Sequence, residues 1–144
     1  MIIGRTEVVI DEGQNTTYLA LNETLIAFGT AVEDKRYDVA MDILEGLPYT
    51  LETEAMWQQL SQITLKARKL HIAERCFAAL GDVAKSRYLQ KINKLIKYVE
   101  KELVPGSDGM EYYEVQARLE LLEKHFHKAE ELYLEQVCLF FICT

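Results

Sequence analysis

Residues 70–77 read LHIAERCF, and this short stretch decides the fold. It begins with a large apolar residue, which is followed by two residues of no fixed type and then by an alanine. Two more residues of no fixed type follow, and the stretch ends with two residues that have large or polarizable side chains. The same order recurs in YDVAMDIL at residues 37–44 and in FHKAEELY at residues 126–133. A small alanine lets two helices approach closely, and the pair that follows fills the groove between them. The pattern therefore predicts three closely packed helices, each the second member of an antiparallel pair.

The spacing of these segments predicts a repeat. Ala40 and Ala73 are 33 residues apart, close to the 34-residue period of tetratricopeptide hairpins. Trp57 stands 16 residues before Ala73, where that repeat has its tryptophan, and Tyr113 stands 16 before Ala129. The interval from Ala73 to Ala129 is longer, at 56 residues. We therefore expect an all-α fold, an irregular α-solenoid of tetratricopeptide-like helical hairpins, with a plain helical bundle as the alternative.

Seven helices and one short strand are expected along the chain. The strand lies in residues 1–10, which alternate weakly, and it ends at the turn-rich residues 11–15. It needs a partner strand in this chain or in another chain, unless it is a cut end, because its backbone groups are unpaired alone. Apolar stripes that include Leu25, Ile26 and Leu103 are expected to face inward. The predicted helices cover residues 22–32, 36–45, 52–69, 70–80, 83–103, 111–123 and 126–137. The expected divisions are a strand and linker (1–21), a helical-repeat domain (22–137) and an apolar tail (138–144).

Composition limits the classes of protein. With 144 residues and 49% hydrophobic side chains, the chain has the material for one folded domain. Its net charge of −7 argues against a general nucleic-acid coat protein, and no apolar run reaches the about 20 residues of a membrane span. Its three cysteines lack zinc-type spacing and fit a reducing compartment. These features predict a soluble, mostly helical, intracellular domain.

Charge is concentrated in the middle of the sequence. Residues 66–101 hold ten Lys and Arg against three Asp and Glu, a net charge of +7 between acidic flanks. On the predicted fifth helix the basic side chains share one side, opposite the apolar stripe. Such a face is commonly only solvated, but it also suits an acidic partner, a membrane surface, nucleic acid or a calmodulin-type target. The candidate partner-binding residues are Arg87, Lys91, Lys94, Lys97 and Lys101.

No motif for catalysis, a cofactor or a metal stands out. His125 and His127 are two residues apart and would point to different sides of a helix, so we expect no zinc site there. Cys76 lies on the inner stripe beside Phe77 and is interpreted as a small buried hydrophobe rather than a nucleophile. There is no glycine loop with the spacing that binds phosphate. We therefore expect a protein that is not an enzyme.

Several segments together resemble one family. They include RTEVV at residues 5–9, LIAFGTA at 25–31, ETEAMW at 52–57 and the long run LHIAERCFAALGDVAK at 70–85. Tyr113, the run VQARL at 115–119 and the run LEQ at 134–136 continue the resemblance. These stretches are similar to the intraflagellar transport protein 172 family, the largest subunits of the ciliary complex IFT-B. The resemblance covers residues 5–136.

The resemblance implies a scaffold. Members of that family begin with WD40-type β-propellers and continue as a tetratricopeptide-like solenoid, and this chain resembles the junction between them. By resemblance, it is a non-catalytic segment that binds other intraflagellar transport train subunits during cilium assembly. The implied location is the cilium or flagellum and the basal body, on the cytoplasmic side. The alternative hypothesis is a free-standing helical-repeat adaptor whose basic helix binds an acidic partner outside cilia.

The sequence also departs from the family. The chain is far shorter, and the lysine content of residues 90–104 is higher than the family leads us to expect. The apolar end, VCLFFICT at residues 137–144, does not continue as the family does, and we interpret it as a truncation or read-through end. Open solenoid ends predict self-association at high concentration.

Overall fold

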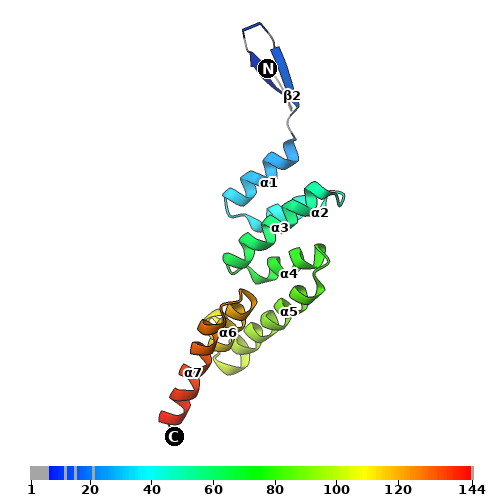
Figure 1. Ribbon diagram of the computed structural model, residues 1–144. Coiled ribbons are helices and arrows are strands. Elements are labelled where there is room, and N and C mark those ends of the chain that lie inside the picture. The colour runs from blue at the N-terminus through cyan, green and yellow to red at the C-terminus, as the bar shows by residue number, and fades with distance from the viewer. Residues whose placement is uncertain (1–6, 12, 15, 21, 144) are drawn as a thin grey trace. The chain divides into compact units, whose positions relative to one another are not determined.

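A computed structural model describes residues 7–11, 13, 14, 16–20 and 22–143 (Figure 1). The chain divides into two compact units, Met1–Gly81 and Asp82–Thr144. The described residues contain seven α-helices, so the predicted all-α class fits the structure apart from one β-hairpin near the start. No helix in the described ranges is long and apolar enough to cross a bilayer.

The first unit begins with the hairpin. Strand β1 (Glu7–Asp11) pairs antiparallel with β2 (Thr16–Ala20), and Val9 lies opposite Tyr18. Gly13, in the connection, has a φ of 84°, which a residue without a Cβ adopts readily. The sequence analysis had assigned residues 16–20 to a linker, so the second strand corrects that prediction. Residues 16–20, TTYLA, do not alternate between polar and apolar side chains, so they lack the pattern that predicts a strand.

Four helices complete the first unit: α1 (Glu23–Glu33), α2 (Tyr37–Glu45), α3 (Leu51–Lys66) and α4 (Leu70–Ala79). Helix α1 packs against α2, and α3 packs against α4; helix α2 also contacts α3 and α4. The Asn22 side chain caps α1 by accepting bonds from the amides of Thr24 and Leu25. Gly46 and Pro48 follow α2 directly, as predicted.

The core of the first unit lies between these two hairpins. Leu44, Trp57 and Leu60, from α2 and α3, are at most 5% exposed and belong to one cluster. Ala40 and Ala73 are completely buried, so the alanines of the repeat pattern lie where the helices approach each other. Leu25 and Ile26, by contrast, are 43% and 51% exposed, which corrects the predicted inner stripe of α1. That stripe is narrower and is centred on Phe28 and Ala31.

The second unit contains α5 (Val83–Tyr98), a π-helical segment η1 (Val99–Leu103), a 3₁₀ turn η2 (Gly109–Glu111), α6 (Tyr113–Leu122) and α7 (Phe126–Ile142). The Asp82 side chain caps α5, accepting a bond from the Lys85 amide at 3.0 Å. The helical run reaches Leu103, as predicted, but its last five residues are π-helical. The wider π turn changes the angular register of the helix, and Leu103 is 46% exposed instead of buried.

A close backbone approach fixes the turn between α5 and α6. Gly109 is buried in η2, and a Cβ there would lie 2.7 Å from the carbonyl oxygen of Ile96 on α5. No side chain fits at that distance, so glycine is required. Tyr88 on α5 adds a second link, because its hydroxyl donates to the Arg118 carbonyl of α6 at 3.0 Å.

Helix α7 is longer than predicted. We expected it to end near Val137, but it continues to Ile142. Helix α2 ends at Glu45 and is followed by Gly46 and Pro48, whereas the corresponding positions in α7 are Glu135 and Val137, which permit the helix to continue. The predicted apolar tail is therefore the last turn of a helix as far as Ile142.

Candidate protein-binding surfaces

Three turns of the chain are built alike and define a structural repeat. The turns between α1 and α2, α3 and α4, and α6 and α7 each contain one residue with positive φ: Lys35 (58°), Arg68 (58°) and Lys124 (65°). In the first turn the Arg36 amide donates to the Ala31 carbonyl at 2.8 Å, and the same bond recurs in the other two at 2.9 and 2.8 Å. This is the Schellman arrangement that ends helices.

The buried alanines follow these turns at a constant distance. Ala40, Ala73 and Ala129 each lie five residues after the positive-φ residue and are at most 1% exposed. The α6–α7 hairpin of the second unit therefore has the same local design as the two hairpins of the first. These equivalences allow position-by-position comparison among the three hairpins.

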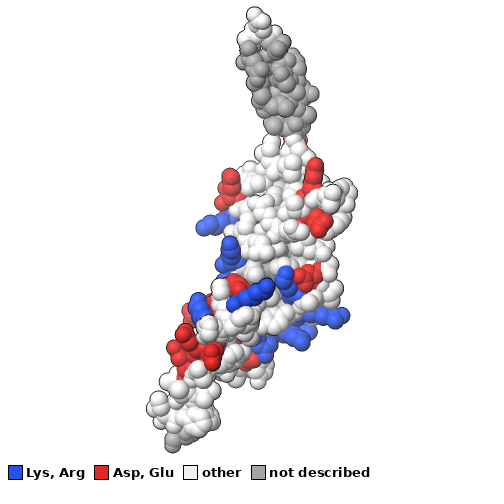
Figure 2. Space-filling view, viewed as in Figure 1, with Lys and Arg blue, Asp and Glu red and all other residues white. Residues whose placement is uncertain are grey.

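The five predicted partner-binding residues are all exposed on α5 and η1. They lie opposite the buried side of the helix, where Leu89, Ile92 and Val99 are at most 1% exposed. In the described part of the chain, none of these five cations has an ion pair. Blue atoms gather over α5 in the space-filling view (Figure 2). The structure thus presents the basic stripe, defined as Arg87, Lys91, Lys94, Lys97 and Lys101, as an open surface.

Burial of the opposite face limits the uses of this helix. An amphipathic helix binds a membrane surface or a calmodulin-type groove through its apolar side. With Leu89, Ile92 and Val99 already buried, only the charged side of α5 is available. The basic stripe can therefore act through electrostatic attraction and hydrogen bonds to carboxylates.

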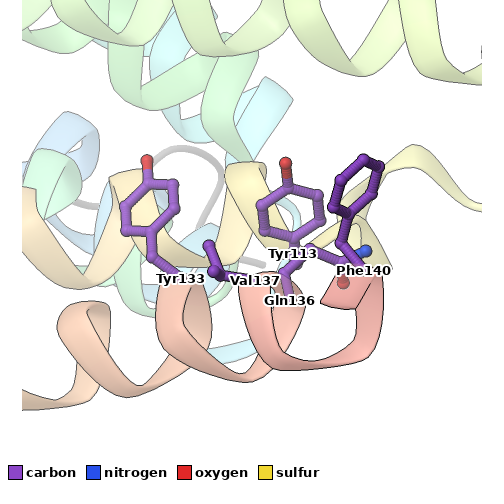
Figure 3. A pocket seen from close by; sticks show the side chains of 5 residues that line it. All are labelled: Tyr113, Tyr133, Gln136, Val137 and Phe140. Atoms are coloured by element: carbon purple, nitrogen blue, oxygen red, sulfur yellow. The ribbon is translucent and has the colours of Figure 1, made fainter. Parts of the chain in front are cut away.

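A second surface is an apolar groove in the second unit. It has a volume of about 290 Å³ and is lined by Tyr113 of α6 and by Tyr133, Gln136, Val137 and Phe140 of α7. The Tyr113 and Tyr133 rings meet edge to face, with centroids 6.1 Å apart. In Figure 3 the side chains of Tyr133, Val137 and Phe140 project to the same side of α7. The sequence did not reveal this groove, because the predicted last helix ended near Val137 and left Phe140 outside it.

The turn between α6 and α7 holds an ion cluster that the sequence analysis also missed. Glu120 is 3% exposed; one carboxylate oxygen lies 2.8 Å from His125 Nδ1 and the other 3.1 Å from Lys128 Nζ. Burial raises the pKa of Glu120, but the hydrogen bonds from His125 and Lys128 lower it more, and it lies below its usual value. An alignment of the three hairpins could have revealed Glu120, because the equivalent residues in the other two hairpins, Ala31 and Thr64, carry no charge.

The same cluster contains ligands suited to a metal ion. Single ligand atoms of Glu120, Glu123 and His125 lie within 4.8 Å of one another, the one such group found in the described residues. The spacing of His125 and His127, on which the sequence argument depended, does not reveal this group, because the two acids come from the end of α6 and the turn that follows it. The Lys128 ammonium group, however, already contacts the Glu120 carboxylate, and its positive charge opposes a bound cation. The arrangement is that of an internal ion network that joins the turn to α7.

Cys76 is buried in the core and is unsuited to nucleophilic chemistry. Its side chain is 0% exposed and belongs to the apolar cluster of the first unit. Burial raises the pKa of its thiol to about 12, so the reactive thiolate is not formed near neutral pH. This agrees with the interpretation of Cys76 as a small buried hydrophobe.

Taken together, these features define a helical-hairpin protein with surfaces suited to binding other macromolecules. No model of a known protein family matches the chain. Individual relatives do match: the intraflagellar transport protein 172 homologues of zebrafish (Danio rerio) and human are 51% and 50% identical over 133 residues, or 92% of this chain. The Chlamydomonas reinhardtii protein is 48% identical over 132 residues. By sequence, this chain matches a segment of the intraflagellar transport protein 172 family, which confirms the resemblance.

The matched segment is a small part of these relatives. The chain spans about 8% of the zebrafish and human proteins and 7% of the Chlamydomonas protein. The lower identity of 35% to the intraflagellar transport protein osm-1 of Caenorhabditis elegans covers the same 92% of the chain. The match therefore extends over helices of both units.

Proposed function

We propose that this chain is a non-catalytic scaffold segment that binds protein partners in intraflagellar transport and cilium assembly. The observation that carries the proposal is the match of about 50% identity over 92% of the chain to intraflagellar transport protein 172 homologues. On this proposal the partners are other subunits of the transport train. The location is the cilium or flagellum and the basal body, on the cytoplasmic side.

The repeated hairpins support the scaffold role. Helical hairpins that share one turn and one buried alanine are the units from which α-solenoids are stacked, and such stacks bind along extended surfaces. We place the chain at the start of the tetratricopeptide-like solenoid of the family, after the propellers. The three equivalent hairpins and the shifted spacing of the third fit an irregular solenoid rather than a regular array.

Expression of the tagged chain in ciliated cells tests this proposal. We expect enrichment at cilia and basal bodies and co-purification of train subunits, identified by mass spectrometry. An Ala73→Leu variant, which destabilises the α3–α4 hairpin, should weaken both properties, and Ala78→Leu, on the exposed side of α4, is the matched control that should keep them. Uniform cytoplasmic distribution of the unaltered chain, without any train subunit in the purified material, would contradict the proposal.

The basic stripe favours a second candidate function, a helical-repeat adaptor that binds an acidic partner outside cilia. Five exposed cations with no ion pair in the described residues form a surface complementary to a row of carboxylates. The triple charge reversal Lys91→Glu, Lys94→Glu and Lys97→Glu should abolish binding to such a partner. The matched control reverses three exposed lysines of the first unit: Lys35, Lys66 and Lys69.

Two readouts separate the candidates. If the stripe acts as an adaptor surface, binding weakens with rising salt while helix content by circular dichroism stays constant. If the triple reversal leaves every interaction intact, the adaptor function is wrong. If it removes only train subunits from the purified material, the stripe serves the scaffold function instead.

A further inference from the structure

The cations of the basic stripe form an evenly spaced row along α5 and η1. Successive members are separated by four, three, three and four residues, and none has an ion pair in the described part of the chain. At a rise of about 1.5 Å per residue, they recur about every 5 Å over a length of about 21 Å. The stripe is therefore a straight line of positive charge rather than a compact cluster.

An exposed aromatic ring lies within this row. Tyr98 stands four residues after Lys94 and seven after Lys91, which places it on the same side of α5. Its side chain is 54% exposed. Tyrosine and arginine are enriched where proteins bind one another, because each combines a broad contact surface with polar atoms. A row that holds Arg87 and Tyr98 among lysines therefore has the composition of a docking surface and not only of a solvated face.

The spacing of the cations matches the turns of a second helix. Carboxylates at about positions i, i+4, i+7, i+11 and i+14 of a helix lie on one face and recur about every 5.4 Å. Same-side residues of an extended segment are about 6.7 Å apart instead, so over the length of the stripe the difference adds up to about 5 Å, which is one whole position. A helix that lies along α5 can thus pair all the cations of the stripe at once, whereas an extended segment loses register.

Acidic neighbours limit the width of the partner. Glu100 and Glu102, which precede and follow Lys101 in η1, are exposed, and the chain as a whole has a net charge of −7. A nucleic acid carries a phosphate at every nucleotide and would bring some of them close to these carboxylates, which repel them. A helix about 10 Å wide with carboxylates on one face can keep them over the stripe alone. The charge distribution therefore favours an acidic helix over nucleic acid.

A further hairpin of the same repeat is unsuited to this surface. The hairpins of the chain pack through a small alanine and large apolar side chains, as the buried Ala40 and Leu44 of α2 do. The basic stripe offers neither a small residue nor an aliphatic one. It is therefore not a surface on which the next hairpin of a solenoid stacks, and the composition requires a helix of a different kind.

We infer that the basic stripe binds an acidic helix of a partner protein, whose carboxylates follow the helical pattern given above. The Arg87 guanidinium can hold one carboxylate by two parallel hydrogen bonds, and the lysines pair with the others. The Tyr98 ring packs against an uncharged side chain between the carboxylates. This inference rests on the proposed role of the stripe as a binding surface and adds the kind of partner that it binds.

Binding of designed peptides to the full chain tests the inference. The first is an alanine-based peptide of about 18 residues, helical by circular dichroism, with its glutamates in the striped pattern and one leucine among them. A second peptide has the same composition with the glutamates spread around the helix, and a third has the striped order interrupted by central prolines. Fluorescence anisotropy at about 50 mM salt should show that the striped peptide binds about tenfold more tightly than either, or better.

Substitutions on α5 identify the surface that binds. The triple charge reversal of the stripe should weaken binding of the striped peptide about a hundredfold, whereas the control reversal of the three first-unit lysines should leave it unchanged. A peptide whose three central glutamates are replaced by lysine should bind the reversed chain in turn, because the charges then match again. Tyr98→Ala should weaken binding about five- to tenfold, and Leu51→Ala, at an 86% exposed position of the first unit, should not. All of these side chains are exposed, so circular dichroism should show unchanged helix content.

The outcomes that would overturn the inference can be told apart. If the three acidic peptides bind equally and the triple reversal weakens all of them, the stripe is a binding surface but its helical partner is wrong. If none of the peptides binds, the adaptor function fails together with the inference. Tighter binding of a single-stranded nucleic acid of about 20 nucleotides than of the striped peptide would overturn the inference in favour of nucleic acid.

Discussion

One carboxylate oxygen of Glu120 lies 2.8 Å from Nδ1 of His125 and ties the end of α6 to the start of α7. The other oxygen contacts Lys128, so both oxygens of a carboxylate that is 3% exposed have a cationic or donor partner. The corresponding residues of the first two turns, Ala31 and Thr64, carry no charge. The stability of the third hairpin therefore depends on pH through the Glu120 carboxylate, and the equivalent positions of the other two hairpins contribute no such dependence.

Replacement of Glu120 by glutamine should lower the free energy of unfolding by about 1 to 2 kcal/mol at pH 7, since charge-assisted hydrogen bonds are lost. Because the pKa of Glu120 in the folded chain lies below its usual value of 4.5, this stability is present above that value. It is lost as the pH falls through the lower folded pKa. Urea unfolding at a series of pH values measures the difference, and exposed Glu131→Gln is the control. A difference that persists in strong acid would contradict this origin.

Glycine at the positive-φ positions should stabilise the chain. Lys35 and Arg68 adopt a φ of 58°, which crowds the Cβ of any residue except glycine. Lys35→Gly and Arg68→Gly should each raise the free energy of unfolding by about 0.5 to 1 kcal/mol, after the entropy of the unfolded glycine is counted. Gln62→Gly, within α3, should instead lower it by about 1 kcal/mol. Thermal unfolding followed by circular dichroism compares the three.

Enlarging the repeat alanine should separate the packed helices. Ala73 is completely buried on α4, and leucine there should cost about 1 to 3 kcal/mol because the core has no room for it. Ala78→Leu, on the exposed side of the same helix, is the matched control and should be nearly neutral. Equal stability of the two variants, measured by urea unfolding, would show that Ala73 does not fix the helix spacing.

Gly109→Ala should destabilise the second unit. Its new Cβ would lie 2.7 Å from a backbone oxygen of α5, and backbone cannot move aside as a flexible side chain does. We expect a loss of about 2 to 4 kcal/mol, in the range of severe packing defects. Gly29→Ala on α1, where a Cβ meets nothing within 4 Å, should be neutral or slightly stabilising. Hydrogen exchange of the backbone amides can show whether the lost stability lies in α5 and α6.

The three cysteines should differ in reactivity. The Cys76 thiol is buried and its pKa is raised to about 12, whereas Cys138 and Cys143 are exposed. Iodoacetamide at pH 7 should therefore modify Cys138 and Cys143 but reach Cys76 only after denaturation. Mass spectrometry of proteolytic peptides reads out each site. Rapid modification of Cys76 in the folded chain would place it outside the core.

Local sequence was sufficient for the helices and their repeat. The packed helices could be predicted from the positions of Ala40, Ala73 and Ala129, because helix period and side-chain size are local properties of the chain. Asn22 and Asp82 were recognised as caps for the same reason, and the long run at residues 70–85 was enough for the family resemblance that the relatives confirm.

Tertiary structure decided which side chains meet. Glu120 and His125 look like ordinary surface residues in sequence, and only the turn between α6 and α7 joins them to Lys128. The exposure of Leu25 and the groove beside Tyr133 likewise depend on which neighbouring helix is present, and the exposure of Leu103 depends on the π-helical segment that contains it. The sequence by itself determined where helices form and where they can approach closely. Burial and ion pairing are properties of the packed neighbours, so only the fold determined which surfaces stay open.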